Sequence, residues 1–394
     1  MPSKKAQKSA AGSGSIRQRT VVSRGKTYTY WEARFISGYH PGTGKPISRS
    51  ISGKTQREVA LKLREATAAV DTNTFLEPTK LTIGQWLDIW AKEYLCNLKP
   101  NTAYAYRAAV ANNIKPNIGA LKLNQISPHD VQTFYNELGK RMCPKTVKNI
   151  HGIFHRAMQQ AVTNRYLPFN PCDGCILPRI EKSEMHPLDE FQIAEFLDAI
   201  KGHRFEALYT VALFTGMREG EILGLTWDSV DFIRGCLSID KQLQRPRSGG
   251  ACQLVSPKNS RPRTLTPAPF VMAILQKVRR KQMEWRLAGG EKFQNSMNLV
   301  FTKEDGVYLT QQTVYRNFKE VVAQIGAEDV RFHDLRHTYA VAAIRSGDDI
   351  KTVQSNLGHA TAAFTLDVYG HVTDQMKLDS ANRMERFYRS VANA

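Results

Sequence analysis

The sequence predicts a mainly α-helical fold with small β-sheets, arranged in three domains. A chain of 394 residues is long enough for two or three domains at roughly 100–200 residues each. Helical periodicity covers most of the chain, whereas strand-like runs rich in Val, Thr and Tyr are short and lie in two regions. We therefore expect a three-stranded sheet plus one helix over residues 15–75, a helical bundle over 80–168, and a mixed α/β domain over 187–394.

The first domain follows a basic, small-residue tail, residues 1–14, that we expect to be disordered. The run "TVVSRGKTYTYWEARF" places a Gly-containing turn between β-forming residues, and "ISRSIS" supplies a third strand after a turn-rich loop. Thr55 and Glu58 then have the spacing of a capping box. The helix that follows has one apolar stripe, formed by Val59, Leu63, Ala66 and Val70.

The second domain is predicted from signals that start helices. Thr and Ser are favoured at helix starts because their side-chain oxygens accept hydrogen bonds from free backbone N–H groups. Pro is favoured in the first turn because its missing N–H would have no intrahelical partner there. Four helices of this length joined by short loops make a compact bundle. The helix starts are marked by Thr82, by Pro100, by Ser127 with Pro128, and by Pro144.

The bundle is followed by an expected linker, residues 169–186. The stretch "LPFNPCDGCILPRIEKSEMHP" carries four prolines and reads as a connection between domains. Cys172 and Cys175 in this stretch form a lone C-x-x-C pair. A zinc site is the alternative, but no second pair at zinc-site spacing accompanies it, so we favour incidental cysteines.

The third domain is predicted to be mostly helical, with strand-like runs at "CLSID", "RTLT" and "NLVFT". The segment between the first two runs, residues 241–263, is long, basic and rich in Gly and Pro. We expect this segment to form a mobile hairpin tip.

Charge narrows the class of partner. The chain has 55 Lys and Arg residues against 36 Asp and Glu residues, a formal net charge of +19. Fifteen basic and five acidic residues lie among the first 80, so about half of the excess sits in a fifth of the chain. A polyanionic partner is the simplest explanation, and a basic enzyme without such a partner is the alternative. Six cysteines, no secretory signal and no apolar run of membrane-spanning length favour a cytoplasmic protein with no membrane partner.

Five residues could together act on a phosphodiester. Arginine forks match phosphate oxygens better than a lysine point charge does. Histidines can move a proton near neutrality. A tyrosine becomes a usable nucleophile beside cations or a base. The residues are Arg218, His333, Arg336, His359 and Tyr369.

The boxes that contain these residues resemble those of the tyrosine recombinases, the integrase family of phages and conjugative transposons. "TGMREGEILGLTW", "HDLRHTYA", "LGHA" and "VYGHV" occur in the order of that family, over about residues 180–390. The helical domain resembles the family's core-site DNA-binding domain, and the N-terminal sheet resembles the arm-type DNA-binding domain. The resemblance implies site-specific cutting and rejoining of DNA through a 3′-phosphotyrosine intermediate.

The resemblance also implies a role for each residue. Tyr369 would be the nucleophile, and the two arginines would clamp the scissile phosphate. His333 would be a general base or a phosphate donor, and His359 a second donor. Lys258 matches the hairpin lysine that protonates the leaving 5′-oxygen, with Lys241, Arg261 and Arg263 as alternative cations.

Other polar groups near the boxes are expected to have supporting or local roles. Glu221 lies three positions after Arg218, so we expect an ion pair that orients this arginine. Asp334 is expected to bond locally, and His337 to pack or cap within its helix. Metal-dependent nucleases hold divalent cations with clustered carboxylates, which these boxes lack, so we expect no metal and no other cofactor.

The resemblance implies double-stranded DNA, with core and arm sites, as the main partner. It further implies a homo-tetramer on two duplexes, with the C-terminal helix packed on a neighbouring protomer; packing on its own domain is the alternative. An excisionase or a host DNA-bending protein would be an accessory partner. Two other functions stay open: a type IB topoisomerase acting on one duplex, and a non-catalytic DNA-binding relative.

Overall fold

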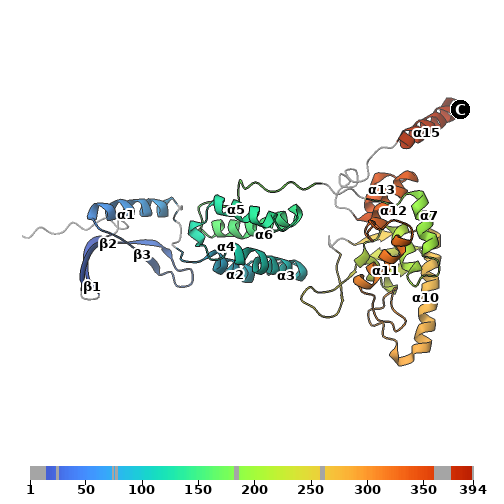
Figure 1. Cartoon of the computed structure of the whole chain (residues 1–394), viewed down its shortest axis with the longest axis horizontal. Coiled ribbons are helices and arrows are strands. Elements are labelled where there is room, and N and C mark those ends of the chain that lie inside the picture. The colour runs from blue at the N-terminus through green and yellow to red at the C-terminus, as the bar shows by residue number, and fades with distance from the viewer. Residues whose placement is uncertain are drawn as a thin grey trace, which may run out of the picture. The chain divides into compact units, whose positions relative to one another are not determined.

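The computed structural model is mainly helical with small antiparallel sheets, as predicted (Figure 1). The chain divides into two compact units, Met1–Glu181 and Lys182–Ala394. The structure describes residues 15–23, 26–72, 75, 79–181, 186–257, 262–358 and 374–392.

The first unit begins with a three-stranded antiparallel sheet. Its strands β1 (Ser15–Ser23), β2 (Lys26–Tyr39) and β3 (Pro46–Gly53) lie in the order β1-β2-β3. Helix α1 (Gln56–Asp71) packs on one face of the sheet (Figure 1). The opposite face carries alternate side chains of each strand, because successive residues of a strand point to opposite faces.

The core of this module lies between α1 and the sheet, and it contains Ala33 and Phe35 from β2 with Val59 and Leu63 from α1. The predicted capping box is half formed. Thr55 Oγ1 accepts from the Glu58 N–H, but the Glu58 carboxylate accepts from the N–H of Lys54 instead of Thr55.

A helical bundle follows, and its helices begin where the sequence predicts. Thr82 and Ser127 cap α2 and α5 with reciprocal capping boxes, and prolines occupy the first turn of α3 and α6. A π-helical turn, Val110–Ile114, continues α3 into a short α4. The helices are α2 (Ile83–Glu93), α3 (Pro100–Ala109), α4 (Lys115–Ile118), α5 (Pro128–Gly139) and α6 (Pro144–Thr163).

The start of the expected linker packs on this bundle. Cys172 belongs to the bundle core, and Cys175 and Leu177 pack against that core. The hydroxyl of Tyr135 lies 3.7 Å from Cys172 Sγ. Burial raises the pKa of the Cys172 thiol to about 12, so this thiol stays protonated at neutral pH.

The second unit is a helical domain with two small sheets. The three-stranded sheet has the order β4-β5-β8, and β6 and β7 form a separate two-stranded ribbon. The strands are β4 (Val230–Asp231), β5 (Cys236–Ile239), β6 (Gln242–Gln244), β7 (Gln253–Val255) and β8 (Arg263–Leu265). The helices are α7 (Glu190–Ala199), α8 (Glu206–Thr215), α9 (Glu219–Leu223), α10 (Pro269–Gly289), α11 (Gln311–Gln324), α12 (Asp334–Arg345), α13 (Ile350–Leu357) and α15 (Asp374–Ala392).

Two of the three strand predictions in this unit are confirmed, at β5 and β8. The third, "NLVFT", is wrong: Leu299 and Thr302 make only isolated bridges, to Thr226 and Tyr308. The run is apolar because Leu299, Val300 and Phe301 are buried in the core, not because it belongs to a sheet.

The segment predicted to be a hairpin tip contains the ribbon β6–β7, and this ribbon packs closely on α9. Gly224, just after α9, permits the approach. A Cβ added there would lie 2.6 Å from the carbonyl carbon of Gln242, well inside van der Waals contact.

None of the described helices combines the length and apolar character needed to cross a bilayer.

Candidate active site

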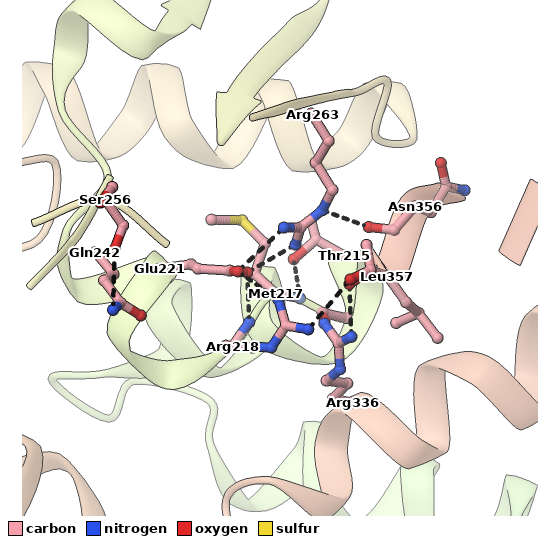
Figure 2. Close-up of polar contacts among 12 residues, drawn as sticks. Thr215, Met217, Arg218, Glu221, Gln242, Ser256, Arg263, Arg336, Asn356 and Leu357 are labelled. Carbon is pink, nitrogen blue, oxygen red and sulfur yellow. Dashed lines mark hydrogen bonds and ion pairs between the residues drawn. The ribbon is translucent and has the colours of Figure 1, made fainter. Parts of the chain in front are cut away.

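Three consecutive carbonyl groups at the end of α13 accept hydrogen bonds from three arginines (Figure 2). A helix leaves its last carbonyls without intrahelical partners and carries partial negative charge at this end, which favours cations there. The arginines come from β8, α12 and the start of α9, so only folding brings them together. The bonds run from Arg263 Nε to Asn356 O (2.8 Å), from Arg336 Nη2 to Leu357 O (2.5 Å) and from Arg218 Nη2 to Gly358 O (3.3 Å).

Arg218 follows a tight turn and starts a helix, as the sequence predicts. It is the N-cap residue of α9, and Gly216 makes the turn after α8 with a φ of 61°. A Cβ at Gly216 would meet the ring of Tyr339 at 2.5 Å, so both the backbone conformation and the space require glycine. The Arg218 side chain is 21% exposed and can still reach a ligand.

Glu221 is a fully buried carboxylate that joins two of the arginines. Its Oε1 accepts from Arg218 Nη1 at 2.7 Å and from Arg263 Nη1 at 3.0 Å. Its Oε2 accepts from the Arg218 backbone N–H at 3.0 Å and from Arg263 Nη2 at 2.7 Å. Burial opposes ionisation of this carboxyl, but the hydrogen bonds and charges of Arg263 and Arg218 outweigh burial and lower its pKa to about 2. The ion pair expected between Arg218 and Glu221 is present.

Arg336 lies on α12 and is almost completely buried, with 3% of its surface exposed. Its Nη1 donates to the carbonyl of Gly216 at 2.7 Å, and its Nη2 to that of Leu357. Arg336 therefore links the turn that precedes Arg218 to the end of α13 (Figure 2).

His333 is the residue just before α12, and its ring stacks edge-to-face with that of His337, with centroids 5.1 Å apart. Burial, followed by the charges of His337 and Arg336, lowers the pKa of His333 to about 4. The imidazole is therefore neutral at pH 7, and it can accept a proton or donate a hydrogen bond.

Asp334 bonds locally, as expected. Both its oxygens accept from the side chain of Arg331, at 2.9 and 3.0 Å, and the Arg331 N–H donates to the same carboxylate. His337 lies 3.9 Å from Asp334, and its own burial lowers its pKa. These contacts hold the first turn of α12, which contains Arg336 and directly follows His333.

Glu219 is a second glutamate of α9, in an opposite environment. Its Oε1 is buried, without a hydrogen-bond partner among the described residues. Burial raises the pKa of this carboxyl to about 7. The pKa values of two glutamates on one short helix are thus shifted in opposite directions, because only Glu221 meets arginines.

Of the seven predicted site residues, the structure brings Arg218, Glu221 and Arg336 together at the arginine cluster, and His333 lies near enough that the charges of Arg336 and Arg218 lower its pKa. The other three, Lys258, His359 and Tyr369, lie outside the described residues. Gly358, the last described residue before His359, is at the arginine cluster. Arg263 also belongs to this cluster, although the sequence predicts it only as an alternative hairpin cation.

Two family models match the sequence. The "Phage integrase family" model matches residues 186–376, and the "Phage integrase, N-terminal SAM-like domain" model matches residues 82–139. The tyrosine recombinase XerC-like protein of Caldanaerobacter subterraneus is 28% identical over 366 residues, which cover 88% of this chain and 93% of that protein. The ICEBs1 integrase of Bacillus subtilis is 23% identical over 359 residues, which cover 88% of this chain and 95% of that protein.

Solved structures share the fold. The Tn1549 transposon integrase in complex with transposon right end DNA has a TM-score of 0.67 and 21% identity, and the match covers 77% of this chain and all of that one. A lambda integrase tetramer bound to a Holliday junction has a TM-score of 0.55 and 18% identity, with 88% of this chain and 94% of that one covered. The chain therefore belongs to the phage integrase family and is a tyrosine recombinase, an enzyme that breaks and rejoins DNA strands.

Proposed function

We propose that the protein is the site-specific integrase of a mobile element or phage, and that Tyr369 attacks the scissile phosphate. The phenol oxygen bonds to phosphorus as a 3′-phosphotyrosine, while the bond from phosphorus to the 5′-oxygen breaks and that oxygen takes up a proton. Attack by a 5′-hydroxyl from another strand reverses the step. Because the ester keeps the energy of the broken bond, the reaction needs no nucleotide.

The observation that carries this proposal is the convergence of Arg218 and Arg336 at one helix end. A pentavalent phosphate gathers negative charge on its non-bridging oxygens in the transition state. Two planar guanidinium groups fixed before the reaction can stabilise that charge with paired hydrogen bonds. Glu221 stays ionised at any physiological pH, since its pKa is about 2, and so keeps Arg218 oriented.

The remaining roles are proposed from the family resemblance. His333, neutral at pH 7, would take the proton of Tyr369 or donate to the phosphate, and His359 would donate to it. Lys258 would protonate the leaving oxygen. The donors of Arg263 are bonded to Glu221 and Asn356, and Lys241 lies 3.7 Å from Asp240, which supports Lys258 over these two alternatives.

DNA contact outside the active site is proposed for both domains of the first unit. On the open face of the N-terminal sheet, the side chains of Arg17, Arg19 and Arg34 surround Glu32 at 3.3, 2.7 and 3.7 Å. Three half-exposed arginines around one carboxylate leave this face positive, as a surface that binds phosphates must be. We assign arm-type sites to this face and core-type sites to the helical bundle.

Assembly is proposed to follow the family. The apolar side chains of α15 are exposed among the described residues, at 59–66%, and we propose that they pack on a neighbouring protomer of a tetramer on two duplexes. They are Leu378, Met384, Phe387, Tyr388 and Val391. An excisionase or a host DNA-bending protein would set the direction of recombination, in the nucleoid of a bacterial cytoplasm.

The test is a trapped intermediate. Duplexes that bind the full-length protein are selected from a random pool, nicked near the centre so that the cleaved 5′ end is lost, and incubated with the protein. We expect a covalent protein–DNA adduct that maps to the peptide containing Tyr369. Tyr369→Phe should abolish the adduct and leave DNA binding nearly unchanged. An adduct that persists in this variant would reassign the nucleophile.

A second assay separates the recombinase from a topoisomerase. The selected site is placed on two duplexes, and joined products are measured beside relaxation of one supercoiled plasmid. Joining between two sites supports the integrase. Relaxation of any supercoiled plasmid without joining would favour the type IB topoisomerase.

A further inference from the structure

We propose that Arg263 is a positioning residue that aims Arg218 and fixes the end of α13, an inference that rests on the proposed phosphate chemistry. Arg263 begins β8, and its side chain is 9% exposed. All three of its guanidinium nitrogens donate within the protein (Figure 2). Arg263 therefore acts through the groups it holds and not by touching DNA.

The first link runs through Glu221 to Arg218. Arg263 binds both carboxylate oxygens with its two terminal nitrogens, at 3.0 and 2.7 Å, and so fixes the plane of that carboxylate. The same two oxygens accept from the Nη1 and the backbone N–H of Arg218. The direction of the Arg218 fork is thus set by a carboxylate whose own orientation is set by Arg263.

Arg263 also changes the charge that Arg218 presents. A buried carboxylate with one arginine would cancel the charge of that arginine at short range. Shared between two arginines, Glu221 leaves one net positive charge on the group formed by Arg218, Arg263 and Glu221. Arg218 therefore keeps attraction for a phosphate even though it is ion-paired.

The second link runs to the end of α13. Arg263 Nε donates to the carbonyl of Asn356 at 2.8 Å. Gly358 ends the helix with a φ of 64°, and a Cβ there would lie 3.0 Å from Arg263 Cδ. The Arg263 side chain therefore fills the space beside Gly358, from which the chain continues directly to His359. One side chain links the strand after the hairpin, the clamp arginine and the segment that leads to His359.

The test compares three scissile linkages in the nicked duplex selected with the wild-type protein. The first is the ordinary phosphodiester. In the second, a methylphosphonate, a methyl group replaces one charged non-bridging oxygen, so less charge must be neutralised. In the third, a 5′-phosphorothiolate, a sulfur replaces the leaving oxygen, and sulfur leaves without a proton. Single-turnover rates of adduct formation are measured with the full-length protein.

We expect Arg263→Met to slow adduct formation on the phosphodiester about 100-fold, the size typical for a misplaced oxyanion donor. The loss on the methylphosphonate should be about tenfold or less, because Arg218 has less negative charge to stabilise on that linkage. The phosphorothiolate should show the full loss. Arg263→Lys keeps the charge but not the fork, and should still lose about tenfold or more.

Two further variants separate positioning from folding. Arg263→Met combined with Glu221→Gln removes both buried charges, so no unpaired charge is left to destabilise the fold. No carboxylate then orients the guanidinium group of Arg218, and the rate of adduct formation should remain low. Arg279→Met is the matched control: Arg279 lies over the ring of Trp227, 5.8 Å from its centroid, and should keep the wild-type rate on all three linkages.

Several outcomes would overturn the proposal. If Arg263→Met loses the same factor on all three linkages, the role of Arg263 is purely structural. If its rate recovers on the phosphorothiolate, Arg263 acts at the leaving group. If Arg263→Lys or the double variant reacts at the wild-type rate, Arg263 only balances the charge of Glu221. If the wild type forms the adduct and Arg263→Met matches it, only the role of Arg263 fails. If the wild type forms no adduct on any linkage, the proposed function fails and the role of Arg263 falls with it.

Discussion

Arg218 and Arg336 donate to adjacent carbonyl groups, those of Gly358 and Leu357, although they come from helices far apart in the sequence. Arg336 also holds the turn that precedes Arg218, because the carbonyl of Gly216 in that turn accepts from Arg336 Nη1. Carbonyl groups of the protein therefore hold both arginines of the proposed phosphate clamp in place, and rigid placement of donors is what makes such a site effective.

The fork of Arg336 is expected to matter more than its charge. In Arg336→Lys, one ammonium group cannot bond both Gly216 and Leu357 and still bind a phosphate with paired donors. We expect adduct formation on the nicked duplex to fall about 100-fold or more, with little change in DNA affinity. Arg345→Lys, at the exposed end of the same helix, should behave as wild type. A wild-type rate in Arg336→Lys would argue against the clamp.

His333 is expected to titrate well below neutrality in the free protein. Burial, His337 and Arg336 lower its pKa to about 4, so the imidazole is neutral between pH 5 and pH 8. NMR of the full-length protein with ¹³C-labelled histidine, assigned with His333→Gln, should show a midpoint near pH 4. A midpoint at 6.5 or higher would mean a cationic phosphate donor and not a base.

The same shift predicts how His333 affects stability. Its folded pKa lies below the unfolded value of 6.5, so the unfolded state binds more protons between pH 4 and 6.5. The contribution of the neutral imidazole is fully present above pH 6.5, and it is lost as the pH falls through this window.

Glu219 and Glu221 are expected to have opposite effects on stability. The folded pKa of Glu219 is raised to about 7, so its ionisation destabilises the fold as the pH rises above 4.5. Glu219→Gln should increase the free energy of unfolding at pH 8 by about 1–3 kcal/mol, and change it little at pH 5. Denaturant unfolding at both pH values measures this. An equal change at both would show that the carboxyl does not titrate as stated.

Glu221→Gln is expected to have the opposite effect, because it leaves the guanidinium groups of Arg218 and Arg263 without their shared carboxylate. We expect a loss of about 3 kcal/mol or more at pH 8. The folded pKa of Glu221 is depressed to about 2, so its stabilisation is present above pH 4.5 and is lost as the pH falls toward 2. The two variants should therefore move stability in opposite directions under the same buffer.

The open face of the N-terminal sheet is expected to bind arm-type DNA through its arginines. Arg19→Gln removes the cation closest to Glu32, and should weaken binding to a selected arm duplex and reduce the slope of its salt dependence by about one. Arg64→Gln on α1, the helix that covers the other face, is the control and should change neither. If both variants weaken binding equally, the positive charge of the module matters and the face does not.

Local chemistry explains which structural predictions succeeded. The helix starts at Thr82 and Ser127 were predictable because a cap depends on residues three positions apart. The ion pair of Arg218 with Glu221 was predictable for the same reason. The strand expected at "NLVFT" failed because sheet pairing depends on a partner strand that the run itself does not encode.

Contacts between residues far apart along the chain could not be predicted from the sequence. Arg263 and Glu221 are 42 positions apart, and nothing in "SRPR" distinguishes an arginine that points at DNA from one that points at a buried carboxylate. The burial of the Glu219 carboxyl oxygen could not be predicted either, because its environment is set by packing around α9 and not by its neighbours in sequence.

A structure of the full-length Tyr369→Phe protein bound to its selected duplex tests the central claim most directly. We predict one phosphate within hydrogen-bond distance of both Arg218 and Arg336, with the ring of residue 369 facing its phosphorus. Guanidinium groups that touch different phosphates, or that contact only the α13 carbonyls while the ring lies elsewhere in every protomer, would contradict the account.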